Sequence, residues 1–168
     1  MSTARRSAKT PAAAAATLPA HRNLPAHRNL PLLLLQARDS VIASFRPILN
    51  AQRLTEQQWR IVRALIELGP LEPRQIGEVC RISSPSLAGV LARMDEQGLV
   101  SRERMVNDLR RVNIAATAKS RAMAAAMAPK IEAAYRTIEA RVGRAFYDEL
   151  VASLDRVIAV LGEGAAAD

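Results

Sequence analysis

Hydrophobic residues recur at helical spacing over most of the chain from residue 32 onward, which is typical of amphipathic helices. The first such segment, residues 32–51, predicts one helix with apolar positions at Leu34, Leu35, Val41, Ile42, Phe45, Ile48 and Leu49. Pro47 lies near its end. Because proline lacks a backbone donor, we expect it to kink this helix or to tighten its last turn.

A second helix is predicted to begin at Thr55, whose hydroxyl can cap the first turn while Gln58 completes a capping box. Gly69-Pro70 should end it. A third helix should cover residues 72–80, with Ile76 and Val79 facing the core.

A fourth helix is predicted to begin at Ser83 or Ser84 and to end at Gly98, with a buried stripe of Leu87, Val90, Leu91 and Met94. Residues 99–104 and 111–114 then predict a pair of short strands around a basic turn. Three helices followed by a hairpin suit a winged helix-turn-helix, a unit that places one helix in a DNA major groove.

Two more helices should follow the hairpin. Thr117 is predicted to cap a long helix that runs to about Val142 and is bent by Pro129, and residues 146–161 predict a last one. With the first helix, these segments carry more apolar surface than one small core can cover. We therefore expect two copies of the chain to bury it against each other.

The net charge of +8 is concentrated at the N-terminus. Residues 1–31 hold five basic residues and no acidic ones, which leaves 19 of the 24 basic residues against 16 acidic ones, a net charge of +3. This segment is rich in alanine and proline without a periodic apolar face, so we expect a disordered tail. Its repeated Leu-Pro-Ala-His-Arg-Asn holds His21 and His27, which we interpret as solvated residues, with a weak phosphate-binding arm as the alternative.

Composition also narrows the function classes. No apolar run approaches the roughly 18 residues of a membrane span, and no secretory signal is evident, so a cytoplasmic protein is expected. The single cysteine, Cys80, excludes an internal disulfide and is predicted to be a buried, inert thiol, with a redox sensor as the alternative. There is no phosphate loop or metal-ligand spacing, so we expect no enzyme, no cofactor and no metal site.

The candidate DNA-contacting surface of the fourth helix lies opposite its apolar stripe. Small residues there would let the backbone approach a groove floor, and hydroxyls and N-terminal amides suit phosphates or base edges. Arg93 could contact a phosphate or a guanine. The alternative is that the serines only cap the helix and Arg93 is a solvated charge. The candidates are Ser83, Ser84, Pro85, Ser86 and Arg93.

The hairpin supplies the second set of candidates. Asp108 precedes Arg110 and Arg111 closely enough to pair with one of them and brace the turn. The free guanidinium could then enter a minor groove or meet its phosphates. The alternative is an ordinary exposed turn with weak surface ion pairs.

Over about residues 32–161, the sequence resembles the MarR family of bacterial transcription regulators. The resemblance is carried by Leu54-Thr55-Glu56-Gln57-Gln58-Trp59, Ser84-Pro85-Ser86-Leu87, Arg93-Met94-Asp95-Glu96-Gln97-Gly98-Leu99-Val100 and Asp108-x-Arg110. Further strings resemble the members that repress an aromatic-acid (homoprotocatechuate or 4-hydroxyphenylacetate) catabolic operon. They are Leu34-Leu35-Gln36-Ala37-Arg38, Phe45-Arg46-Pro47-Ile48, Thr55-Glu56-Gln57-Gln58-Trp59-Arg60-Ile61-Val62-Arg63 and Ile131-Glu132-Ala133-Ala134-Tyr135-Arg136.

The resemblance implies a mainly α fold with a small β-hairpin wing, a winged helix-turn-helix with N- and C-terminal dimerisation helices. The tail of residues 1–31 departs from the family pattern, and a single domain would cover residues 32–168. Within it, residues 32–53 and 117–161 would form the dimerisation helices and residues 54–116 the DNA-binding lobe. The implied function is a homodimeric repressor on a palindromic operator of double-stranded DNA.

Release by a phenolic acid is also implied, because the family's effector lies between the dimerisation helices and the DNA-binding lobe. An aromatic carboxylate needs a guanidinium and an apolar wall. The candidates are Arg38, Arg46, Trp59 and Arg60. Trp59 could instead be plain core, and Arg38 could form a surface or dimer ion pair.

Three other functions remain open. The chain could be a MarR-like regulator of antibiotic or phenolic efflux, or of thiol-oxidant stress. Thiol sensing is disfavoured, because relatives that sense peroxides carry a cysteine in the first helix and this chain has none there. The chain could also be a helical adaptor that does not bind DNA, in which case salt-dependent DNA binding would be absent.

Overall fold

The computed structural model describes residues 28–105 and 108–162, with side chains described outside residues 104–111. The fold is mainly helical with one two-stranded antiparallel sheet, which confirms the expected class. The elements are α1 (Leu30–Ala43), α2 (Arg46–Ala51), α3 (Glu56–Leu68), α4 (Pro73–Cys80), α5 (Ser84–Glu96), β1 (Val100–Met105), β2 (Asp108–Ala116), α6 (Ala118–Val142) and α7 (Arg144–Gly162).

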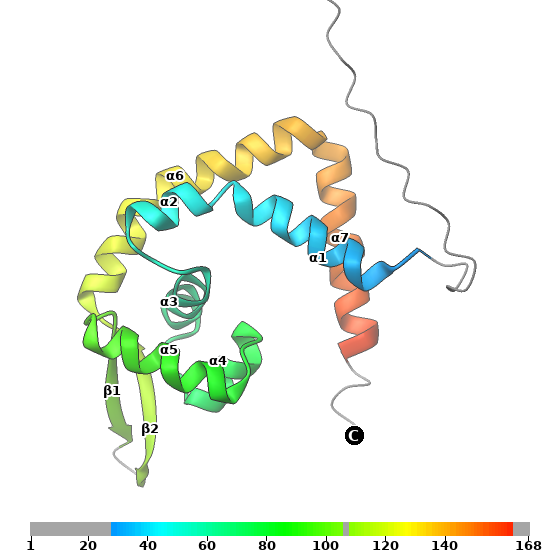
Figure 1. The fold of residues 1–168 in the computed structure, drawn as a ribbon. Helices are drawn as coiled ribbons and strands as arrows, with labels where there is room; N and C mark the ends of the chain where they lie inside the picture. The colour runs from blue at the N-terminus through cyan, green and yellow to red at the C-terminus, as the bar shows by residue number, and fades with distance from the viewer. Residues whose placement is uncertain (1–27, 106–107, 163–168) are drawn as a thin grey trace, which may run out of the picture.

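Helix α3 is the centre of the fold. It contacts α2, α4, α5, α6 and β2, and Figure 1 shows α6 and α2 arching over one side of it while α4 and α5 close the other. The hairpin of β1 and β2 projects away from this body (Figure 1). The hairpin and α5 therefore emerge on the side of the molecule away from the arch.

The core lies around α3 because this amphipathic helix buries one apolar face. Ile61, Val62 and Leu65 of α3 have no exposed surface. They pack in one cluster with side chains from α4, α5, β2 and α6, of which the largest fully buried ones are Ile76, Met94, Ile114 and Met127. The core thus fixes α5 and the hairpin against α3.

The predicted helix boundaries agree where a cap fixes them. The Thr55 hydroxyl accepts from the Gln58 amide at 3.2 Å, and the Gln58 side chain accepts from the Thr55 amide at 2.9 Å, so the capping box is confirmed. Gly69 has φ 84° and Gly98 has φ 66°. Glycine adopts this left-handed conformation without steric penalty, which explains both helix ends.

The single helix predicted over residues 32–51 was wrong, because α1 and α2 are separate and Pro47 lies in the first turn of α2. Proline fits there because the first turn needs no intrahelical donor. Helix α1 also begins earlier than expected, since Asn29 caps it at the Leu32 amide, and Leu30 and Pro31 are helical rather than part of a tail.

The predicted inward position of Val79 was also wrong, since its side chain is 52% exposed. Ile76 and Cys80 face the core instead. They are four residues apart, so they share one face of this short helix and leave Val79 beside it. The strand β2 begins earlier and ends later than predicted. Within it, Ile114 pairs with Leu71 through two backbone hydrogen bonds of 2.8 and 3.1 Å.

Candidate nucleic-acid interface and adjoining cavity

Helix α5 is held by its apolar stripe and presents a polar face. Leu87, Val90, Leu91 and Met94 are all buried, as predicted. The turn before it is short: Arg81 adopts the left-handed conformation at φ 50° and ψ 53°, and the Ile82 amide donates to the Gly77 carbonyl at 3.0 Å. This geometry joins α4 to α5 as a helix-turn-helix with α5 as its second helix.

The serines at the start of α5 do not act as a side-chain cap. Ser83 occupies the N-cap position without a side-chain cap hydrogen bond. Its hydroxyl donates to the Ser86 hydroxyl at 3.1 Å, and Ser83, Ser84, Pro85 and Ser86 are all exposed. The first-turn amides of α5 are therefore not satisfied by these hydroxyls, and a helix N-terminus in this condition suits a phosphate.

Arg93 is the exposed guanidinium on the same helix. Its Nη1 lies 3.5 Å from the position that a Cβ on Gly89 would take, so the side chain folds back along α5. Among the residues whose side chains are described, it forms no ion pair. Arg102 differs, because its Nε donates to the Asp95 carboxylate at 3.0 Å and ties the base of the hairpin to α5. Arg93 is therefore the α5 cation that remains available to a ligand.

The wing candidates are only partly described. The backbone of Asp108, Arg110 and Arg111 lies in β2, where Asp108 pairs with Met105 after an irregularity between Arg104 and Met105. The side chains of these three residues lie outside the described ones. The predicted bracing of the hairpin by Asp108 therefore stays a prediction.

A cavity of about 200 Å³ lies between α1, α3 and α6. Its wall is mostly apolar and aromatic, and its polar residues come from α3 and α6. The residues that line it are Val41, Ile42, Phe45, Glu56, Trp59, Arg60, Arg63, Ile131 and Tyr135. A second cavity of about 280 Å³ shares Trp59, Arg63, Ile131 and Tyr135 with it, so the two adjoin.

Aromatic rings and charged groups both line this cavity. Phe45 and Tyr135 lie with ring centroids 4.9 Å apart at 60°. Arg63 donates to the Glu67 carboxylate at 2.7 Å. This hydrogen bond raises the pKa of Arg63 against the opposing effect of burial, and Tyr135 adds to the rise. Arg63 therefore stays cationic beside an aromatic wall.

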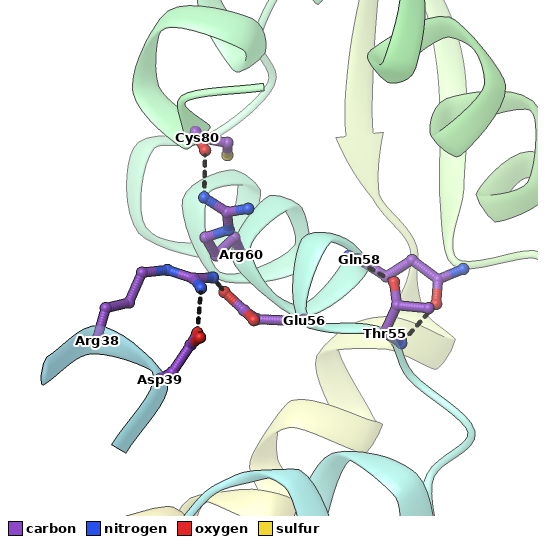
Figure 2. A network of polar contacts seen from close by, with 7 residues as sticks. All are labelled: Arg38, Asp39, Thr55, Glu56, Gln58, Arg60 and Cys80. Carbon is purple, nitrogen blue, oxygen red and sulfur yellow. Dashed lines mark hydrogen bonds and ion pairs between the residues drawn. The ribbon is translucent and has the colours of Figure 1, made fainter. Parts of the chain in front are cut away.

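Two of the four predicted effector residues, Trp59 and Arg60, line this cavity. Arg38 does not line it but pairs with Asp39 and Glu56 (Figure 2). Arg46 is exposed at the start of α2 and is also not among the lining residues. The prediction missed Arg63, although it lies one turn after Trp59 on α3, a spacing that places both on one helix face.

The family model described as MarR family matches residues 54–112, from the loop before α3 into β2. The homoprotocatechuate degradative operon repressor of Escherichia coli is 40% identical over 129 residues, which cover 77% of this chain and 87% of that protein. The chain belongs to the MarR family. This is a family of transcription regulators rather than of enzymes.

Two further proteins are similar to this chain. The HTH-type transcriptional regulator FarR of Neisseria gonorrhoeae is 39% identical over 111 residues, 66% of this chain and 76% of FarR. The crystal structure of NadR in complex with 4-hydroxyphenylacetate superposes with a TM-score of 0.69 at 34% identity, covering 83% of this chain and 97% of NadR. The likeness therefore extends beyond the helix-turn-helix to the helices around the cavity.

Two kinds of feature, a membrane-spanning helix and a metal-binding cluster, are absent from the described part of the chain. None of the helices in the described part of the chain is both long and apolar enough to cross a membrane. Over residues 28–105 and 108–162 there is also no group of three His, Cys, Asp or Glu that could hold a metal ion. His21 and His27 lie outside the described residues.

Cys80 is buried, as predicted. Burial raises the pKa of its thiol above the ordinary value of 9.0, while the charge of Arg60 lowers it less. Since the thiolate is the reactive form, this environment disfavours oxidation at neutral pH.

We expect this burial to appear as a pH dependence of stability. A raised folded-state pKa contributes stability that is complete below the unfolded pKa and is lost as pH rises through the folded pKa. The free energy of unfolding of the wild type, minus that of Cys80→Ala, should therefore fall above a pH of about 9. Denaturant titrations from neutral to alkaline pH measure this difference, and a constant difference would contradict the burial of the thiol.

Proposed function

We propose that this protein is a homodimeric DNA-binding repressor of an aromatic-acid catabolic operon and that a phenolic acid releases it from its operator. The observation that carries the DNA-binding part is the exposed face of α5. It combines an N-terminus that the serine hydroxyls do not cap with Arg93, which has no ion pair among the described side chains, beside a hairpin that is tied to the same helix. Such a face suits a major groove and its phosphates.

The dimer is supported by apolar surface outside the lobe. No residue of α7 is buried, and none of α1 is. Their exposed large hydrophobic residues are Leu30, Leu32, Leu34, Leu35 and Val41 of α1, and Phe146, Leu150, Val151, Leu154, Val157, Ile158, Val160 and Leu161 of α7. A surface of this kind is expected to be covered by a second copy, and a dimer presents two α5 helices to a palindrome.

The effector class is supported by the cavity. Phe45, Trp59 and Tyr135 supply an aromatic wall for a single ring, and Arg60 and Arg63 supply guanidinium groups for a carboxylate. Glu56 could accept a hydrogen bond from a phenolic hydroxyl. The relatives agree with this chemistry, since one is named as a homoprotocatechuate operon repressor and NadR was crystallised with 4-hydroxyphenylacetate.

The protein is then a regulator that acts in the cytoplasm, without a cofactor and without catalysis. The experiment that tests the proposed function is a gel shift on the intergenic DNA upstream of the protein's own gene, with and without 4-hydroxyphenylacetate. We expect a specific complex that weakens steeply with salt and that the phenolic acid dissociates. Phenylacetate, which lacks the hydroxyl, is the matched control and should release less DNA. Absence of salt-dependent DNA binding would instead support the helical adaptor.

A further inference from the structure

We propose that Arg60 is the positioning residue that couples the effector cavity to the recognition helix α5. The inference rests on the proposed function and adds how the effector would act. Arg60 lies on α3 and lines the cavity. On its other side, its Nη1 donates to the backbone carbonyl of Cys80 at 2.8 Å (Figure 2). One guanidinium thus contacts both the cavity and the helix-turn-helix.

The Cys80 carbonyl is a sensitive point of the fold. Cys80 is the last residue of α4, and the last four carbonyls of a helix have no intrahelical donor. The chain then passes through Arg81, in a left-handed conformation, to Ser83 at the N-cap of α5. Arg60 therefore anchors the end of the first helix of the motif just before the second helix begins, and loss of that anchor would free the turn.

Arg60 is also the cation at the cavity whose charge is not neutralised by a described carboxylate. Arg63 pairs with Glu67, and Glu56 pairs with Arg38. The Arg60 Nε is buried and has no hydrogen-bond partner in the described part of the chain. A buried, unsatisfied donor on a charged group is unfavourable. A carboxylate that entered the cavity would find in Arg60 both the charge and the free donor that it needs.

The two interactions compete. Because the Arg60 Nε has almost no accessible surface, a carboxylate can pair with it only if the guanidinium turns, and turning moves Nη1 away from the Cys80 carbonyl. A charge-assisted bond to a carboxylate is stronger than one to a neutral carbonyl. The effector would therefore bind the form with a released α4–α5 turn more tightly, which is the condition for weakening DNA binding.

The test is the substitution Arg60→Met, measured as operator affinity with and without saturating 4-hydroxyphenylacetate. For the wild type we expect a decrease of about 5- to 150-fold, the usual range of allosteric coupling. For the variant we expect weakened operator binding without effector and a change of less than about twofold with it. Saturation removes differences in effector affinity from the comparison. A variant that retains the wild-type ratio would overturn the inference.

The matched control is Arg63→Met, which removes a neighbouring guanidinium from the same helix. It should raise the effector concentration required but keep the ratio at saturation. If the wild type itself fails to bind an operator or to release it, the proposed function fails and this inference with it. If the wild type responds and Arg60→Met responds equally, only this inference fails.

A second measurement needs no variant and so does not depend on the folding of one. The Ile82 amide donates to the Gly77 carbonyl within the turn. Its hydrogen exchange in the full-length wild type should become faster when 4-hydroxyphenylacetate binds, because the turn loses its anchor. In Arg60→Met the same amide should exchange faster already without effector and change little when effector is added. An exchange rate at Ile82 in the wild type that the effector leaves unchanged would overturn the inference.

Discussion

Replacement of Leu154 by glutamate should convert the dimer to a monomer and abolish tight operator binding. Leu154 lies in an exposed apolar stripe of α7 with Leu150, Val157 and Leu161, which follow one another at intervals of three or four residues. In the proposed dimer this stripe would be buried, and a carboxylate placed in it on each of two chains would be desolvated without a partner.

The effect on DNA should be large because the two recognition helices of a dimer bind as linked sites. Linkage of two sites raises the overall affinity by about 10²–10⁴-fold, and a monomer loses that gain. Sedimentation measures the oligomeric state, and fluorescence anisotropy with a labelled operator measures affinity. The control is Ala152→Glu, which adds the same charge about half a helical turn away from the stripe. An unchanged dimer in Leu154→Glu would exclude α7 from the interface.

Substitution of Arg93 by alanine should produce the other large effect. A guanidinium contact to a base or phosphate is worth about 1–3 kcal/mol. Because a dimer carries two such residues, the loss should be roughly 2–6 kcal/mol for a palindromic operator. The exposed position of Arg93 and the absence of an ion pair among the described residues mean that folding should not change.

Anisotropy titrations at several salt concentrations separate the two kinds of contact for Arg93. Loss of a phosphate contact weakens all sequences alike and lowers the salt dependence, whereas loss of a base contact relaxes sequence preference at one position. The matched control is Arg136→Ala, an exposed arginine of α6 that lies 3.9 Å from Glu132 and far from α5 in sequence. If both variants bind the operator as the wild type does, Arg93 has no part in recognition.

Sequence alone predicted the elements whose boundaries depend on local chemistry. The capping box at Thr55, the glycine ends at Gly69 and Gly98, and the buried stripe of α5 each depend on residues within a few positions of each other. The division of residues 32–51 could not be predicted in this way. A proline near a helix end is compatible with a kink or with a new first turn, and only packing against α3 and α6 selects the second.

The residues that line the cavity could also be predicted only in part from the sequence. Trp59 and Arg60 were predicted from the chain, but whether Arg38 faces them depends on how α1 crosses α3, which local pattern does not encode. The structure pairs Arg38 with Glu56 and brings Arg63 and Tyr135 to the aromatic wall instead. The hydrogen bond from Arg60 to Cys80 joins residues 20 positions apart, so it too could be found only after the fold was known.

The central claim is that a rigid dimer places two α5 helices in successive major grooves, with half-sites about one helical turn, or 34 Å, apart. The most direct measurement is the affinity of the wild type for its footprinted operator and for the same operator with about five base pairs inserted between the half-sites, which rotates one half-site by half a turn. We expect the insertion to reduce binding to the level of unrelated DNA. Equal affinity for the two operators would contradict the claim.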